Sequence, residues 1–131
     1  MFKGVRIIIY CYIIMNETGK IYERPWGYYR TIEQKGNYQI KHIRVKPGKR
    51  LSLQYHFKRD EHWTIIKGTG IVQLNDESKE LGVNDTIFIP RESTHRITNN
   101  TDEFVEFIEI QIGDYLGEDD IVRIEDDFGR V

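Results

Sequence analysis

The chain has 131 residues, of which 39% are hydrophobic and 31% charged, so it is long enough for one domain with one core. Its formal net charge of −2, with acidic and basic residues mixed throughout, argues against nucleic acid as the main partner. The single cysteine, Cys11, excludes an internal disulfide framework and favours a reducing compartment, so we expect a cytoplasmic protein.

The N-terminal run from Val5 to Met15 is almost wholly apolar. It is shorter than the roughly 20 residues that span a bilayer, and no small-residue cleavage site follows it. Three interpretations are open: an extra strand, a membrane-associating segment, or sequence upstream of a true start at Met15. We favour the third, and therefore divide the chain into an apolar extension, residues 1–14, and a domain, residues 15–131, with no membrane partner.

The rest of the chain alternates short β-type runs with turn residues. The predicted strands are Tyr28–Glu33, Tyr38–Val45, Leu51–His56, Trp63–Ile66, Ile71–Leu74, Thr86–Ile89, His95–Thr98 and Phe104–Ile112. Turn sequences such as Lys46-Pro-Gly-Lys49 separate them. The tail Leu116–Asp127 is expected to hold one helical turn and then a short strand. Many short strands without sustained helical periodicity predict an all-β fold, and the length fits a single jelly-roll barrel of the kind that includes the cupins.

Four side chains are candidates for a divalent-metal site: Gln54, His56, Glu61 and His95. Gln54 and His56 are two residues apart on a predicted strand, so they share a face. His62 follows Glu61 and is expected to point to the opposite face. Imidazole nitrogen and carboxylate oxygen are ligands that Zn²⁺ accepts, although Mn, Fe, Co and Ni accept them too.

The spacing of these residues resembles the two-part cupin motif. Its first block is Gly48, Gln54, His56, Glu61 and Gly68, and its second is Asn84, Pro90, Glu92, His95 and Asn99. A histidine is usual in the motif at the place of Gln54, and glycines are usual at the places of Asn84 and Glu92. The last two are turn positions, where asparagine tolerates positive φ better than glutamate does.

The set Gln, His, Glu, His resembles the zinc ligands of the type II phosphomannose isomerase family. The matching stretches are Arg24-Pro-Trp-Gly27, Val45–Gln54, Arg59, Glu61-His-Trp63, Gly68-Thr69, Ile89-Pro90, His95-Arg96 and Gly113–Arg123. The resemblance covers Arg24 to Arg130 and implies a double-stranded β-helix with zinc at the four candidates. Many members carry an upstream mannose-1-phosphate guanylyltransferase domain, whose glycine-rich segment is not found in this sequence, so we expect a stand-alone isomerase domain.

The resemblance implies interconversion of mannose 6-phosphate and fructose 6-phosphate, which supplies mannose for GDP-mannose and polysaccharide synthesis. Such a reaction requires a base, a group that stabilises an oxyanion, and a cation for the phosphate. We assign Lys58 and Arg96 as catalytic, because Lys58 lies two residues after His56 and Arg96 lies in a matching stretch. Tyr55 and Glu109 are weaker options for the base. Arg50 and Arg59 are assigned to bind the phosphate.

Other functions stay open. One alternative is a non-catalytic metal-binding cupin that binds a sugar or sugar nucleotide. Members of the family often have a histidine-rich stretch after the first liganding histidine, and this sequence has Phe57-Lys58 there, which keeps that alternative open. A cupin dioxygenase more often has histidine at position 54, and an epimerase needs an acid/base pair that is not legible here. A homodimer is expected only by analogy with other cupins. Arg24-Pro-Trp-Gly27 is interpreted as structural.

Overall fold

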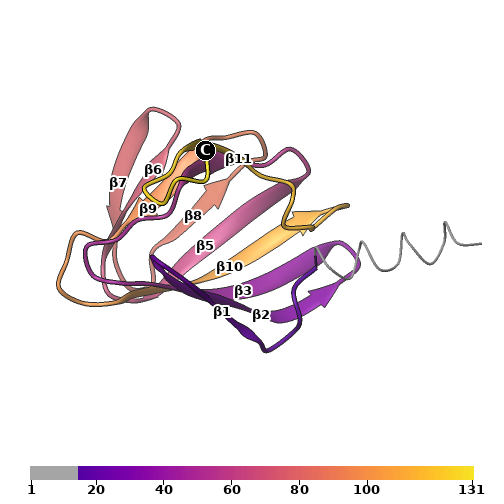
Figure 1. Cartoon of the computed structure of the whole chain (residues 1–131), viewed down its shortest axis with the longest axis horizontal. Coiled ribbons are helices and arrows are strands. Elements are labelled where there is room, and N and C mark those ends of the chain that lie inside the picture. Colours follow the sequence, from indigo (N-terminus) through magenta and orange to yellow (C-terminus); the bar gives the residue numbers. More distant parts are fainter. Residues whose placement is uncertain (1–14) are drawn as a thin grey trace, which may run out of the picture.

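A computed structural model of the chain describes residues 15–131, and these residues form strands without a helix (Figure 1). The strands are β1 (Ile21–Arg24), β2 (Gly27–Lys35), β3 (Tyr38–Val45), β4 (Leu53–Tyr55), β5 (Arg59–Lys67), β6 (Gly70–Leu74), β7 (Glu77–Leu81), β8 (Thr86–Ile89), β9 (His95–Thr98), β10 (Val105–Gly113) and β11 (Val122–Glu125). The described part of the chain therefore contains no helix that could span a membrane. The prediction for residues 1–14 lies outside the described residues.

The strands form two antiparallel sheets that face each other. One sheet has the order β1-β2-β3-β10-β5-β8 and the other the order β11-β4-β9-β6-β7. Their facing sides share one apolar core, in which Trp63, Ile65 and Phe107 of the first sheet meet Val72 and Ile97 of the second. The predicted all-β, double-sheet fold is confirmed.

The inner face of the first sheet changes from apolar to polar along its strands. In the β10–β3 pairing, Phe107 lies opposite Ile43, and two residues further on Glu109 lies opposite Lys41. Because alternate residues of a strand share a face, all four side chains point into the barrel. This change in polarity leaves one end of the barrel closed by apolar packing and gives the other end a charged interior.

The turns at the two departures from the cupin motif adopt the conformation that the missing glycines would favour. Asn84 has a φ of 75° and Glu92 a φ of 68°. Glutamate is uncommon at positive φ, and here the backbone N–H of Glu92 donates to the carbonyl of His56 at 2.7 Å. That bond anchors the turn before His95 to the end of β4.

Most predicted strands are present, with differences at the edges. The strands β1 and β7 were not predicted. The sequence of β7, Glu-Ser-Lys-Glu-Leu, does not alternate apolar and polar residues, so it carried no strand signal. Its side chains are exposed except for that of Leu81. The tail forms β11, but the predicted helical turn before it is absent from the described residues. Residues 114–121 instead form an irregular connection with a tight turn, in which the N–H of Asp120 donates to the carbonyl of Gly117.

Candidate metal site and pocket

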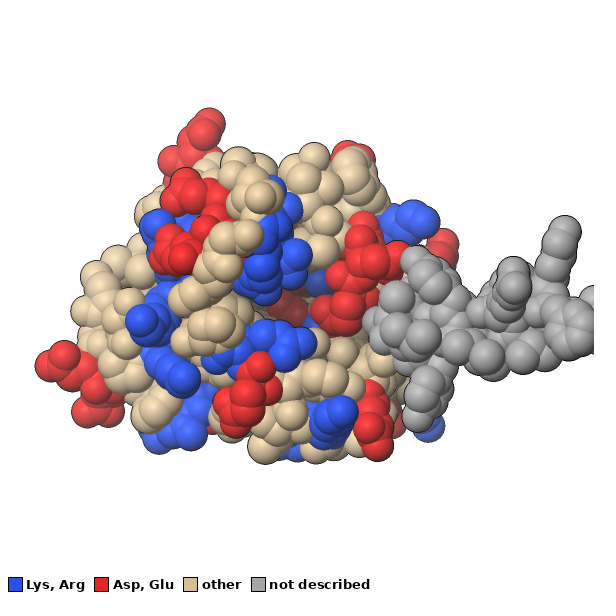
Figure 2. Space-filling view, viewed as in Figure 1, with Lys and Arg blue, Asp and Glu red and all other residues tan. Residues whose placement is uncertain are grey.

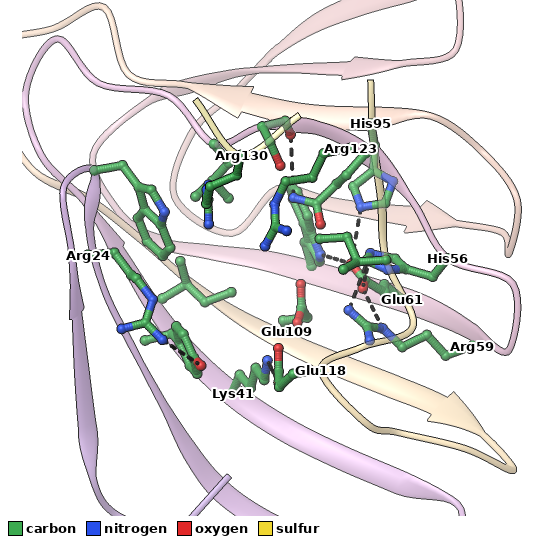
Figure 3. Close-up of a pocket in the computed structure, with 18 residues that line it drawn as sticks. Arg24, Lys41, His56, Arg59, Glu61, His95, Glu109, Glu118, Arg123 and Arg130 are labelled. Atoms are coloured by element: carbon green, nitrogen blue, oxygen red, sulfur yellow. Dashed lines mark hydrogen bonds and ion pairs between the residues drawn. The ribbon is translucent and has the colours of Figure 1, made fainter. Parts of the chain in front are cut away.

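His56, Glu61 and His95 come together inside the barrel. His95 begins β9, Glu61 lies in β5, and His56 follows β4. Each offers one ligand atom, and the three atoms lie within 4.8 Å of one another. The Nε2 atom of His56 is 3.2 Å from Glu61 Oε2, and that of His95 is 3.5 Å from Glu61 Oε1. All three side chains are buried, and they point toward one another in the close-up (Figure 3).

Main-chain carbonyls fix the orientation of both imidazoles. His56 Nδ1 lies 2.7 Å from the carbonyl oxygen of Asp120, and His95 Nδ1 lies 2.9 Å from that of Ser93. A carbonyl only accepts hydrogen bonds, so each Nδ1 carries the proton and donates it. The Nε2 lone pairs are then available as metal ligands, which is the usual arrangement of metal-binding histidines.

Gln54 lies beside this cluster and lines the same pocket. It pairs with His95 across β4 and β9. Its Nε2 donates to the carbonyl of Ser52 at 3.4 Å, so the amide oxygen is the atom that this residue could offer to a metal. The four residues thus offer two imidazole nitrogens, a carboxylate and an amide oxygen.

The carboxylate of Glu61 is held by two donors. Arg59 Nε donates to Oε2 at 2.9 Å, and Trp63 Nε1 donates to Oε1 at 3.0 Å. Burial alone would raise the pKa of Glu61, but the charge of Arg59 and the contacts with His56 outweigh it and hold the pKa well below its usual range. Burial also lowers the pKa of His95. An ionised carboxylate and neutral imidazoles are the protonation states that a divalent metal requires, so this donor set fits one.

A pocket of about 180 Å³ opens from the cluster. Its lining includes five cationic side chains: Arg24, Lys41, Arg59, Arg123 and Arg130. In the space-filling view, basic and acidic groups meet at a hollow on this face of the molecule (Figure 2). In the close-up, Arg24 and Arg130 lie on the side of the pocket away from His56 and Arg59 (Figure 3). Arg123 lies between them and the cluster, paired with Gln54 across β11 and β4. A metal at one side and cations at the other suit an anionic ligand with oxygens at both ends.

The floor of the pocket carries two further carboxylates. Glu118 accepts from Lys41 Nζ at 2.5 Å and from Asn16 Nδ2 at 2.6 Å. Glu109 lies on β10 and accepts from Gln111 Nε2 at 2.7 Å. Burial, reinforced by the negative charge of Glu61, raises the pKa of Glu109 to about 8. Glu109 is therefore a buried carboxyl of the pocket lining whose pKa lies above its usual range.

The structure brings only some of the predicted cations to this pocket. Arg59 lies in it, buried against Glu61, with Nη2 at 3.2 Å from His56 Nε2. Lys58 is exposed, and its ammonium lies 4.9 Å from the centre of the Tyr115 ring, outside the pocket lining. Neighbouring strand residues point to opposite sides, and at the start of β5 it is Arg59 that points inward.

Arg96 and Arg50 also lie outside the pocket lining. Arg96 is buried, but it donates to the carbonyl of Leu51 and to Glu125. Arg50 pairs with Asp127 and Glu125 at the surface. Both arginines connect the C-terminal segment to the second sheet.

Sequence reasoning assigned no site role to Arg24, Lys41, Glu118, Arg123 or Arg130. Arg24, Glu118 and Arg123 lie in two of the stretches that carry the family resemblance, which was the available signal. Arg24 was interpreted as structural, yet it lines the pocket and donates to Tyr29 at 3.4 Å. The five residues come from both ends of the described chain, so their convergence depends on the fold.

A double-sheet barrel with a His/Glu cluster inside defines the cupin class. A solved structure of oxalate decarboxylase from Bacillus subtilis is similar in fold, with a TM-score of 0.72 and 23% identity over 80% of this chain and 30% of that one. The model of the family described as mannose-6-phosphate isomerase C-terminal matches residues 14–126, so the chain belongs to that family.

Two curated relatives are similar in sequence. The alginate biosynthesis protein AlgA of Pseudomonas aeruginosa is 50% identical over 107 residues, and the mannose-1-phosphate guanylyltransferase ManC of Salmonella typhimurium is 48% identical over 108 residues. The matches cover 82% of this chain in both cases and 22% of each relative. The chain thus spans about a fifth of the length of these relatives.

Proposed function

We propose that the protein is a metal-dependent sugar-phosphate isomerase that interconverts mannose 6-phosphate and fructose 6-phosphate. The observation that carries this proposal is that the His56–Glu61–His95 cluster and the arginines Arg24, Arg123 and Arg130 line one pocket. Membership of the mannose-6-phosphate isomerase C-terminal family supports it. The names of AlgA and ManC support a place in the supply of mannose for polysaccharide synthesis.

The phosphate is proposed to bind at Arg24, Arg123 and Arg130, of which Arg24 and Arg130 lie across the pocket from His56 and Arg59. Burial and the neighbouring charge of Arg130 lower the pKa of Arg123, so an anion placed between these two guanidinium groups would relieve their repulsion. The buried Nε of Arg123 has no hydrogen-bond partner among the described residues. Guanidinium groups bind phosphate with paired, charge-assisted hydrogen bonds. With the phosphate there, the C1 end of an open-chain sugar would reach towards the cluster.

Gln54, His56, Glu61 and His95 are proposed to hold the metal, with zinc as the first expectation. When bound, the metal would polarise the sugar oxygens at C1 and C2 and stabilise the charge of the enediolate. Arg59 also points at this place. Its Nη1 is buried without a hydrogen-bond partner among the described residues, and its other nitrogens contact Glu61 and His56. Arg59 is therefore placed to donate to an oxygen that becomes negative.

Glu109 is proposed as the base, in place of Lys58. It lines the pocket, whereas Lys58 is exposed outside it. The Glu109 carboxylate would accept the proton from C2 of the aldose, which gives an enediolate with its charge on the oxygen at C1. A proton would then pass from the hydroxyl at C2 to the oxygen at C1, and return of the first proton from Glu109 to C1 would leave a ketone at C2. The side-chain amide of Gln111 holds the carboxyl of Glu109 in place through its bond to Oε2.

The test compares Glu109→Gln with the wild-type protein in a coupled assay of mannose 6-phosphate conversion, at equal metal content. We expect a loss of at least about 100-fold in kcat, since general base catalysis contributes about 10² to 10⁴, with little change in KM. His62→Gln is the control, because His62 stacks on Phe88 on the outer face of β5. Full activity of Glu109→Gln would contradict the assignment of the base. Tight binding of mannose 6-phosphate without turnover by the wild type would favour the non-catalytic alternative.

A further inference from the structure

The connection between β10 and β11 contains the tight turn Gly117–Asp120, which lies against the end of β4. Asp120 forms three long-range contacts there. Its Oδ1 accepts from the backbone N–H of Phe57 at 2.9 Å, its Oδ2 accepts from that of Lys58 at 3.0 Å, and its carbonyl accepts from His56 Nδ1 at 2.7 Å. Asp120 is 8% exposed. Asp120 therefore holds the backbone after His56 through its carboxylate and the His56 imidazole through its carbonyl.

The two imidazoles of the cluster depend on the fold to different degrees. His95 donates to Ser93, two residues away, so its partner is supplied by the local chain. The partner of His56 is 64 residues away. The orientation of His56 therefore depends on how firmly the turn Gly117–Asp120 is docked. The carboxylate of Asp120 supplies two of the hydrogen bonds that dock it.

Glu118, which lies in the same turn, accepts hydrogen bonds from the side chains of Lys41 and Asn16. These contacts reach β3 and the segment before β1. With both sides of the turn fixed, the carbonyl of Asp120 has little freedom to move away from His56.

We propose that Asp120 is a positioning residue for the metal site: its carboxylate docks the Gly117–Asp120 turn so that its carbonyl holds His56 with Nε2 towards Glu61 and His95. The inference rests on the metal site of the proposed function. It does not depend on which reaction that site performs. Partners that orient a metal-binding histidine typically contribute about 10- to 100-fold to metal affinity.

The test measures Co²⁺ and Zn²⁺ affinity by competition with a chromophoric chelator, together with the visible absorption spectrum of the Co²⁺ form. Asp120→Ala removes both acceptors, and Asp120→Asn keeps one. We expect dissociation constants raised about 10- to 100-fold in Asp120→Ala and by less in Asp120→Asn, with an altered Co²⁺ spectrum. Asp119→Asn is the matched control, because it removes the same charge from the same turn and its contact with Tyr115 is at the surface. It should retain wild-type affinity.

Unchanged Co²⁺ affinity and spectrum in a folded Asp120→Ala variant would overturn the inference. If that variant does not fold, as judged by circular dichroism, Asp120→Asn takes its place, and wild-type affinity there overturns the inference equally. A wild-type protein that binds no Co²⁺ would also overturn it. A wild-type protein that binds Co²⁺ but does not isomerise mannose 6-phosphate would contradict the proposed function and leave the role of Asp120 intact.

Discussion

Gln54 and His95 lie directly opposite each other in the β4–β9 pairing, although they come from the two separate halves of the sequence motif. At position 54 the cupin motif usually has a histidine, so this pairing places an amide beside His95 where an imidazole is usual. We expect Gln54→Leu to weaken Zn²⁺ binding by about tenfold, because one donor of the set is lost while His56, Glu61 and His95 remain. Gln54→His should restore affinity. Chelator competition measures both, and unchanged affinity in Gln54→Leu would show that Gln54 is no ligand.

Arg123 and Arg50 provide a matched test of the phosphate site. Arg123 lines the pocket, whereas Arg50 pairs with Asp127 at the surface. Arg123→Gln should raise KM for mannose 6-phosphate by about 10- to 100-fold, since a hydrogen bond to a charged group contributes about 1.5–3 kcal/mol. Arg50→Gln should leave KM unchanged. If Arg50→Gln raised KM and Arg123→Gln did not, the phosphate would bind at Arg50, as the sequence analysis predicted.

Glu109 should make the stability of the metal-free protein depend on pH. Its pKa is raised from 4.5 to about 8, first by burial and then by the charge of Glu61. The fold therefore favours the protonated carboxyl. This contribution is complete below about pH 4.5 and is lost as the pH rises through about 8. In chelator, the wild-type melting temperature should fall between pH 6 and pH 9 more steeply than that of Glu109→Gln. Parallel curves would contradict the raised pKa.

Trp63 links the core to the metal cluster. Its ring packs on Phe107 in the core, and its Nε1 donates to Glu61. Trp63→Phe keeps most of the packing but removes the donor, so unfolding should become easier by about 1–3 kcal/mol, as measured by urea denaturation. Metal affinity should fall as well, because one of the two bonds that orient Glu61 is lost. Trp26→Phe is the control, since Trp26 lines the pocket without a hydrogen bond to Glu61. A fall in stability without a fall in metal affinity would assign Trp63 to packing alone.

The sequence was informative where the chemistry is local. The spacing of Gln54, His56, Glu61 and His95 predicted a cluster, and three of these side chains do converge around one point. Asn84 and Glu92 both adopt positive φ, as the glycines usual at these turns would, although glutamate is the less suitable residue there. Both features belong to motifs of a few residues, in which local backbone geometry decides the outcome.

The failures concern contacts between distant segments. Nothing near Lys41 or Arg130 in the sequence indicates that they line one pocket with Arg24, because only the packing of the two sheets brings β1, β3 and the C-terminal segment together. His42 lies between Lys41 and Arg44 in a charged part of the sequence, which favours a surface position, yet it is 9% exposed and lies 2.7 Å from Glu106 of the neighbouring strand. Lys58 looked inward by its spacing from His56, but β4 ends at Tyr55 and alternation does not continue through the turn.

The central claim is that this pocket isomerises mannose 6-phosphate and requires a metal at His56, Glu61 and His95. The most direct measurement is conversion of mannose 6-phosphate to fructose 6-phosphate by the wild-type protein, first metal-replete, then after chelator, and again after Zn²⁺ is restored. We predict activity that is lost on chelation and recovered with the metal. Activity that persists undiminished in chelator, or none in the metal-replete protein, would contradict the claim.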